Sequence, residues 1–159
     1  MEVSRRGIRL IQHYEGLRLN AYLDSVGVPT IGYGSTLGVK MGDEITEAQA
    51  LEVLEADIER HADPVRKAVD VPINQHQFDA LVAFVFNVGA RAFRESTLLR
   101  KLNAYDYIGA ADEFPRWIHA GGRALDGLKR RRASERGLFL EAVLSSTWLD
   151  EVAAIPRKD

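Results

Sequence analysis

The chain has 159 residues, enough to bury a hydrophobic core and too few for two ordinary independent domains. Its content of 46% hydrophobic and 28% charged residues is typical of a globular protein. A formal net charge of -2 gives no general attraction to nucleic acid, and the absence of cysteine excludes disulfides, thiolate metal ligands and a thiol nucleophile. No apolar run approaches the roughly 18–20 residues that span a bilayer. We therefore expect a single soluble domain over residues 1–159, without a membrane span.

The N-terminal segment predicts an amphipathic helix. Apolar residues recur at helical spacing over residues 4–14. Gly16 follows as a typical helix stop, so the helix is expected to carry Glu15 at its end.

The next segment predicts a small β-hairpin. Residues 17–34 are rich in glycine and in β-branched or aromatic residues, which favours strands joined by a turn. A hairpin centred on Gly27 would place Asp24 opposite Thr30, with their Cβ atoms about 4.5–5.5 Å apart. This pairing would bring a carboxylate and a hydroxyl together on one face.

From Thr46 onward the sequence is mainly helical. Thr46 and Gln49 form a capping-box pattern at the start of a long helix. Residues 74–88 are apolar around most of the helix circumference, which predicts a central buried helix. The remaining expectations are helices over 97–103, 106–118 and 126–144, a loop opened by Gly121 and Gly122, and a Trp148 that folds back onto the core.

Three polar residues near the hairpin have a distinctive spacing. Glu15, Asp24 and Thr30 are separated by nine and six positions in EGLRLNAYLDSVGVPTIGYG. Taken singly, such residues are usually a surface charge, a turn former and a strand residue. Their joint spacing resembles the motif of the T4-type and P22-type phage lysozymes, glycoside hydrolase family 24. The similarity continues through NQHQFDALVAFVFNVGARAFRESTLLRKLN, FPRWIHAGGRALDGLKRRRASERGLF and the closing SSTW, over essentially the whole chain.

The resemblance implies a lysozyme-like α+β fold. It has a small hairpin lobe at about 14–45, a connecting helix at about 46–68, and a larger helical lobe at about 70–159 that also includes the first helix. The glycan would run through the groove between the two lobes.

The resemblance also implies a reaction. Glycoside hydrolysis needs one carboxylic acid that is protonated when substrate arrives and a second carboxylate across the sugar. Partial burial at the rim of the helical lobe would keep Glu15 protonated, whereas Asp24 on an exposed hairpin would stay ionised. In the inverting arrangement of the family, Glu15 protonates the leaving oxygen, and Asp24 with Thr30 orients the attacking water.

Four further positions match the glycan cleft of the family. Gly34 and Thr36 correspond to places where the sugar approaches the backbone. Phe86 and Asn87 correspond to an aromatic ring and an amide that face the sugar, although core packing accounts for Phe86 equally well.

One arginine is expected beside the acid. Arg131 matches the family's arginine that pairs with the catalytic Glu, and Arg132 is the next candidate. Ser35 stands where many relatives carry a histidine, so any ion pair made by that histidine must be absent or replaced.

Other function classes fit parts of this pattern. A lytic transglycosylase also cuts peptidoglycan but needs only one catalytic Glu, which would leave Asp24 and Thr30 superfluous. A lysozyme-like hydrolase with chitinase-like specificity is a weaker alternative. A non-catalytic glycan-binding module would not need the carboxylate pair. A nucleic-acid binder would rely on the basic run at 129–132, which lacks interleaved aromatic residues.

The expected partner is the glycan strand of bacterial peptidoglycan. We expect a monomer that binds no nucleic acid and needs no cofactor or metal, since the four histidines show no shared spacing for a metal site. The resemblance implies a phage lysis protein that waits in the host cytoplasm until a holin opens the membrane, and then acts on the wall.

Overall fold

A computed structural model describes residues 1–141 and residue 154. In chain order its elements are α1 (Arg5–Glu15), β1 (Arg18–Leu23), β2 (Pro29–Gly32), α2 (Glu47–Ala68), α3 (Gln75–Val88), α4 (Ala90–Arg94), α5 (Thr97–Asn103), α6 (Tyr107–Ala111), the 3-10 helix η1 (Phe114–Arg116), β3 (His119–Ala120), β4 (Arg123–Ala124) and α7 (Asp126–Leu140). Within the described residues, no helix is both long and apolar enough to cross a membrane.

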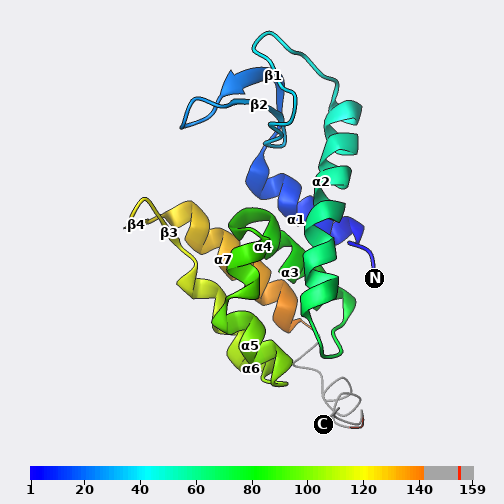
Figure 1. Ribbon diagram of the computed structural model, residues 1–159, viewed down its shortest axis with the longest axis vertical. Coiled ribbons are helices and arrows are strands. Elements are labelled where there is room, and N and C mark those ends of the chain that lie inside the picture. Colours follow the sequence, from blue (N-terminus) through cyan, green and yellow to red (C-terminus); the bar gives the residue numbers. More distant parts are fainter. Residues whose placement is uncertain (142–153, 155–159) are drawn as a thin grey trace.

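The molecule has a small β lobe and a larger helical lobe, as expected for the lysozyme-like α+β class (Figure 1). Strands β1 and β2 lie at one end with the loop that follows them, and helices α3 to α7 gather at the other end (Figure 1). Helix α2 runs along the molecule between these two parts, while α1 packs against α3 of the helical lobe.

Helix α1 is fixed at both ends by residues that the sequence makes recognisable. The Ser4 side chain caps its first turn, and Gly16, with φ +70°, ends it. The Ser4 backbone N–H also donates to the buried carboxylate of Asp79 in α3, at 3.0 Å. A Cβ at Gly7 would lie 2.9 Å from the Asp79 side chain, so α1 can approach α3 this closely only because position 7 is glycine. These contacts hold the end of α1 in a defined place.

The hairpin forms as expected, but its pairing differs. Tyr22 pairs with Thr30, so the turn is centred on Val26 and not on Gly27, and the predicted pairing of Asp24 with Thr30 is wrong. The reason is local: the Asp24 carboxylate accepts hydrogen bonds from two backbone N–H groups inside the turn, which tightens it. Because the register differs by two positions and side chains alternate with period two, Asp24 and Thr30 still fall on the same face.

Helices α2 and α3 both begin with a complete capping box. In α2 the Thr46 hydroxyl accepts from the Gln49 N–H, and the Gln49 side chain accepts from the Thr46 N–H. Asn74 and Gln77 repeat the arrangement in α3. Nine consecutive residues of α3, from 77 to 85, are buried, which confirms the predicted central helix.

The core of the helical lobe is aromatic. The Phe84 ring of α3 meets three other rings edge-on, with centroid distances of 6.4 Å to Phe93, 5.3 Å to Phe114 and 5.4 Å to Trp117. Phe139 of α7 packs on Phe114. Helix α7 is thereby set against α3, which carries the residues that face the cleft.

Several expected boundaries differ from the structure. The helix predicted over 106–118 is two short pieces, α6 and η1, and α4 was not expected from the sequence pattern. Pro115 accounts for part of this, because a proline lacks the N–H that would continue an α-helix. The expected loop at Gly121 and Gly122 is the turn of a second hairpin, β3–β4, in which both glycines have positive φ. The predicted end of the last helix at 144 and the position of Trp148 lie outside the described residues.

Candidate active site

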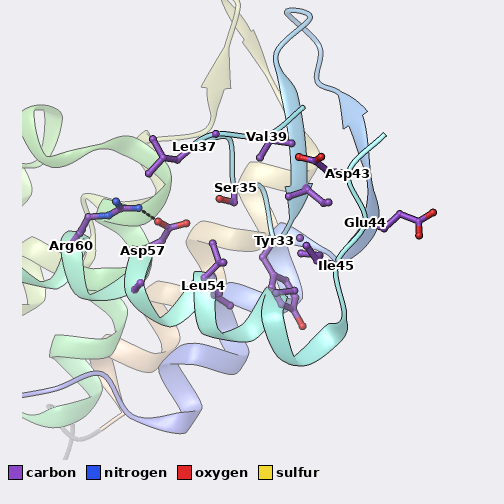
Figure 2. A pocket seen from close by; sticks show the side chains of 16 residues that line it. Tyr33, Ser35, Leu37, Val39, Asp43, Glu44, Ile45, Leu54, Asp57 and Arg60 are labelled. Carbon is purple, nitrogen blue, oxygen red and sulfur yellow. Dashed lines mark hydrogen bonds and ion pairs between the residues drawn. The ribbon is translucent and has the colours of Figure 1, made fainter. Parts of the chain in front are cut away.

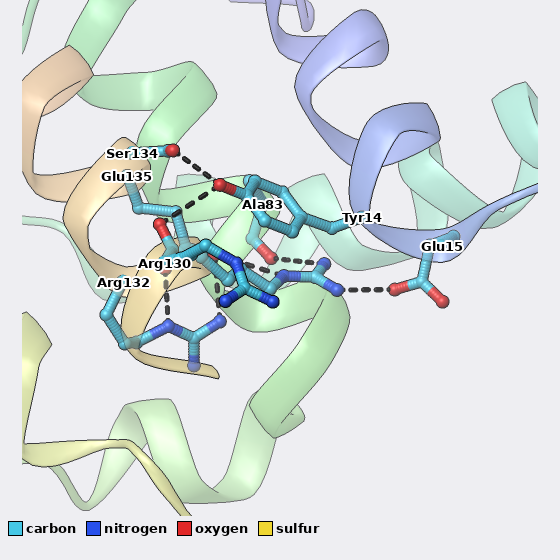
Figure 3. A network of polar contacts seen from close by, with 8 residues as sticks. Tyr14, Glu15, Ala83, Arg130, Arg132, Ser134 and Glu135 are labelled. Atoms are coloured by element: carbon cyan, nitrogen blue, oxygen red, sulfur yellow. Dashed lines mark hydrogen bonds and ion pairs between the residues drawn. The ribbon is translucent and has the colours of Figure 1, made fainter. Parts of the chain in front are cut away.

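Glu15 is the last residue of α1, where the chain leaves the helical lobe for the hairpin. Its side chain is 21% exposed, so the carboxylate is partly buried yet open to a ligand. One oxygen, Oε1, accepts a hydrogen bond from Nη1 of Arg131 at 2.8 Å. The helix end and this ion pair together fix where the carboxylate points (Figure 3).

Gly34 lies against the other carboxylate oxygen. It has φ +88°, and a Cβ built at this position would be 3.3 Å from Oε2 of Glu15. A side chain at position 34 would be strained and would crowd the carboxylate. Glycine therefore leaves one face of Glu15 open toward the β lobe.

Two hollows meet at Glu15. One, of about 380 Å³, lies between α2 and the loop after β2, and it is lined by Glu15, Gly34, Ser35, Thr36, Leu37, Asp57, Arg60, His61, Phe86 and Asn87. The other, of about 600 Å³, lies on the α7 side and is lined by His13, Tyr14, Glu15, Asn87, Leu125, Gly127, Leu128, Arg130 and Arg131. Because Glu15 and Asn87 line both, they form one groove with Glu15 near its middle.

The four residues expected in the glycan cleft lie together. Gly34 and Thr36 come from the loop after β2, whereas Phe86 and Asn87 come from the end of α3, and all four line the same hollow as Glu15. Asn87 is exposed, so its amide is available to a ligand. Phe86 is half-buried: it lines the hollow and also packs against the hydrophobic core.

Asp24 lies just beyond β1, in the turn of the hairpin. Its Oδ1 atom accepts hydrogen bonds from the backbone N–H groups of Val26 at 2.9 Å and Val28 at 2.8 Å. None of the described residues donates a hydrogen bond to its Oδ2. The turn thus holds the carboxylate in place and leaves one oxygen free for a ligand or a water.

Thr30 is connected to Asp24 through Val28. The Thr30 hydroxyl donates to the Val28 carbonyl at 2.9 Å, and the same carbonyl accepts from the Asp24 N–H at 3.0 Å. The Thr30 side chain is buried, with 3% of the residue exposed. Since its only hydroxyl proton is engaged, this oxygen can act toward a further group only as an acceptor.

Of the two arginines expected beside Glu15, Arg131 makes the contact. Arg132 is one position further along α7 and turns away from Glu15; its guanidinium pairs with Glu135 and lies 5.1 Å from the centroid of the Phe84 ring. The hydrophobic surroundings of Arg132 belong to the core of the helical lobe, whereas Arg131 borders the groove.

Helix α2 supplies cleft residues that sequence reasoning missed. Asp57, Arg60 and His61 line the hollow, and Asp57 is ion-paired with Arg60 beside Ser35. The Nδ1 atom of His61 lies 2.6 Å from the Asp57 carbonyl oxygen, so it carries the proton. Burial, with a smaller effect of Arg60, lowers the pKa of His61, which favours the neutral ring. Spacing of i, i+3 and i+4 placed these residues on one helix face, but nothing in the sequence indicated that this face borders the groove.

A further hollow, of about 440 Å³, lies between the loop after β2 and the first half of α2 (Figure 2). Its lining is largely apolar, with Ile31, Val39, Ile45 and Leu54 among its residues. It does not include Glu15. This hollow is therefore distinct from the groove at Glu15.

Comparison with known proteins agrees with this geometry. The sequence profile of the phage lysozyme family matches residues 12–135. An endolysin of Acyrthosiphon pisum secondary endosymbiont phage 1 is 45% identical over 146 residues, covering 89% of this chain and 100% of the relative. The structure is similar to an endolysin from Escherichia coli O157:H7 phage FAHEc1, with a TM-score of 0.84 and 40% identity over 92% of this chain and 98% of that one. It is also similar to the muramidase domain of SpmX from Asticaccaulis excentricus, with a TM-score of 0.83 and 39% identity over 87% of this chain and 97% of that one.

The matched profile includes Glu15, the hairpin, the end of α3 and Arg131, which are the parts that build the groove. The family profile covers most of the chain, and the chain belongs to the phage lysozyme family.

Proposed function

We propose that this chain is a muramidase of glycoside hydrolase family 24, which hydrolyses the β-1,4 bond between N-acetylmuramic acid and N-acetylglucosamine with inversion at the anomeric carbon. The observation that carries the proposal is the position of Glu15. Its carboxylate lies where the two hollows of the groove meet, with Arg131 on one side and Gly34 on the other. Membership of the phage lysozyme family supports an endolysin that lyses the host wall.

Glu15 acts as the general acid. A glycan lying in the groove passes over the end of α1, so the protonated carboxyl can donate to the glycosidic oxygen as the bond breaks. Gly34 leaves room for the sugar beside this group. Thr36, Phe86 and Asn87 bind the flanking sugars through a hydroxyl, an apolar ring and an amide suited to an N-acetyl group.

Asp24 and Thr30 together orient the attacking water. The free Oδ2 of Asp24 and the hydroxyl oxygen of Thr30 are both acceptors, so a water between them would donate one proton to each. Its lone pair would then point away from both, toward the sugar. A carboxylate that activates water needs about 6.5–9.5 Å to the acid and gives inversion, whereas a direct nucleophile needs about 5–5.5 Å and gives retention.

The remaining assignments are part of the same proposal. Residues 1–159 form one domain that acts as a monomer on peptidoglycan. The enzyme is held in the host cytoplasm until a holin opens the membrane, after which it reaches the wall.

The experiment is digestion of purified peptidoglycan, followed by proton NMR before mutarotation and by mass spectrometry. We expect the α-anomer as the first product and a reducing muramic end. A β-anomer would make Asp24 a nucleophile, and a 1,6-anhydro product would identify a lytic transglycosylase. Binding to walls without any cleavage would leave only a glycan-binding module.

A further inference from the structure

A buried ionic cluster lies behind the groove, entirely on α7. Glu135 is 0% exposed, and its Oε1 atom lies 3.4 Å from Nε of Arg131 and 2.9 Å from Nη2 of Arg132 (Figure 3). The spacing of three and four residues places the three side chains on one face of the helix. Neither Arg132 nor Glu135 lines the groove, so the catalytic step proposed above does not use them.

Stability alone is a poor reason for this cluster. Removing charges from water costs more than their attraction returns unless every group is well hydrogen-bonded. Here Nη1 of Arg132 is buried without a hydrogen-bond partner, and its Nε lies 2.7 Å from Glu135 Oε2 without hydrogen-bond geometry. Apolar side chains of similar size would fill the same space at no greater cost, so the charges invite a functional explanation.

Arg131 connects the cluster to Glu15. Its guanidinium contacts Glu135 of α7, lies 3.5 Å from the Ala83 carbonyl oxygen of α3, and lies 5.7 Å from the ring centroid of Tyr14 in α1. All three of these contacts are long. The short bond, at 2.8 Å, goes to Glu15. Glu135 is therefore one side chain removed from the proposed acid.

The positive charge of Arg131 acts against the role of Glu15 as an acid, and Glu135 can offset that charge. A general acid must hold a proton before it reacts, but a neighbouring arginine favours the ionised carboxylate. Without an anion at position 135, Arg131 and Arg132 would be two cations whose charge favours the ionised form of Glu15. We propose that Glu135 is a positioning residue, whose buried carboxylate holds Arg131 and offsets its charge so that Glu15 retains the proton it donates. The inference rests on the proposed role of Glu15 as the acid.

The groups that act on Glu135 are few. They are Arg131 and Arg132, both from its own helix. In the part of the chain that the structure describes, the polar and aromatic groups of the neighbouring helices contact these arginines and not Glu135: the Ala83 carbonyl and the Tyr14 ring face Arg131, and the Phe84 ring faces Arg132. Burial raises the pKa of Glu135 to about 7, against the opposing attraction of the two arginines. Glu135 is therefore ionised mainly above neutrality, which is where its replacement should change the pH profile most.

The test is the pH profile of wall hydrolysis by Glu135→Gln, measured from pH 5 to pH 9 together with the melting temperature. At pH 5 the variant should match wild type within about twofold, because a neutral amide resembles the protonated acid. Above neutrality the rate falls with rising pH, and we call this part of the profile the alkaline limb. The alkaline limb of Glu135→Gln should lie about one pH unit below that of wild type, so that the variant is about tenfold slower at a given pH on the limb.

Glu113→Gln is the matched control. Glu113 is also a buried carboxylate of the helical lobe between two cations, Lys101 at 2.7 Å and Arg116 at 3.2 Å, but it does not border the groove. Its alkaline limb should coincide with that of wild type even where its melting temperature is lower. A limb that does not move in Glu135→Gln, or that moves equally in Glu113→Gln, would overturn the inference.

Two further variants keep the outcomes separate. If Glu135→Gln does not fold, Arg132→Met must move the limb to higher pH, since it removes a cation; an unmoved limb would again overturn the inference. Glu15→Gln must lose at least about 10²-fold in rate at every pH. Wild-type activity of Glu15→Gln would defeat the proposed function itself, whereas that loss in Glu15→Gln beside an unshifted Glu135→Gln would defeat only the role of Glu135.

Discussion

Gly34 combines two constraints, and replacing it with alanine tests whether its contact with Glu15 matters. The residue has φ +88°, where a side chain is strained, and the new Cβ would lie 3.3 Å from Oε2 of Glu15. Glu15 cannot simply rotate away, because Arg131 holds its other oxygen at 2.8 Å. Gly34→Ala should therefore both destabilise the fold and displace the carboxylate.

The two effects have different magnitudes. A left-handed conformation costs a non-glycine residue about 1–2 kcal/mol. For a chain of this size, each kcal/mol lowers the melting temperature by about 2–4 °C, so a fall of about 2–8 °C is expected. A misplacement of about 1 Å costs about 10²-fold in rate, so a carboxylate displaced by a few tenths of an ångström should lose about 3–10-fold in kcat.

Gly38→Ala separates strain from contact. Gly38 also has a positive φ, +69°, but a Cβ there would meet no atom within 4 Å. Both variants should lose similar stability in thermal unfolding followed by circular dichroism. Only Gly34→Ala should lose turnover, measured as release of reducing ends from purified peptidoglycan well below either melting temperature.

Equal turnover in Gly34→Ala and Gly38→Ala would refute the reasoning. It would mean that the carboxylate of Glu15 adapts without cost, or that the groove does not use the face that Gly34 leaves open. A rise in KM with unchanged kcat would show instead that the added methyl group obstructs the sugar without moving the acid.

Four further outcomes are expected. Glu15→Gln should reduce wall lysis by about 10² to 10⁴ while the melting temperature stays within a few degrees of wild type, and wild-type lysis in a turbidity assay would show that another residue is the acid. Arg131→Ala should cost about 2–3 kcal/mol as well as activity, because Glu15 and Glu135 lose a buried partner although Glu135 keeps Arg132; calorimetry that shows unchanged stability would contradict this. Thr30→Val keeps the shape and removes the hydroxyl, so kcat should fall more than glycan affinity, and an unaltered kcat would leave Thr30 a strand residue. Because the pKa of Glu135 is raised from 4.5 to about 7 in the folded chain, its contribution to stability is full below about pH 4.5 and is lost as the pH rises through 7. The stability of wild type relative to Glu135→Gln should therefore fall between pH 5 and pH 8, and a constant difference in denaturant titrations would show that Glu135 is ionised throughout.

Elements whose ends depend on nearby residues were predictable from the sequence. Ser4 and Gly16 bound α1, and the Thr46 capping box begins α2, because these hydrogen bonds join residues three or four positions apart. The same locality placed Glu15 at a helix end. Asp24 and Thr30 were singled out by their spacing in the motif, which is a property of the sequence and needs no knowledge of the packing.

Where local rules competed, the sequence was less informative. The hairpin register depends on which backbone groups the Asp24 carboxylate caps, and a turn centred on Val26 differs from one centred on Gly27 by only two positions in register. The helical pattern over 106–118 continues through Pro115, but its actual division into α6 and η1 depends on how these short pieces pack against α7.

The meeting of distant side chains depends on the tertiary structure. Glu15 and Arg131 are 116 positions apart, and four consecutive basic residues at 129–132 offered similar chemistry. The packing of α7 against α3 turns Arg131 toward the groove and Arg132 into the core, where Glu135 joins them. Such contacts follow from the orientation of whole helices, which is fixed by the sum of many small packing interactions and leaves no short pattern in the sequence.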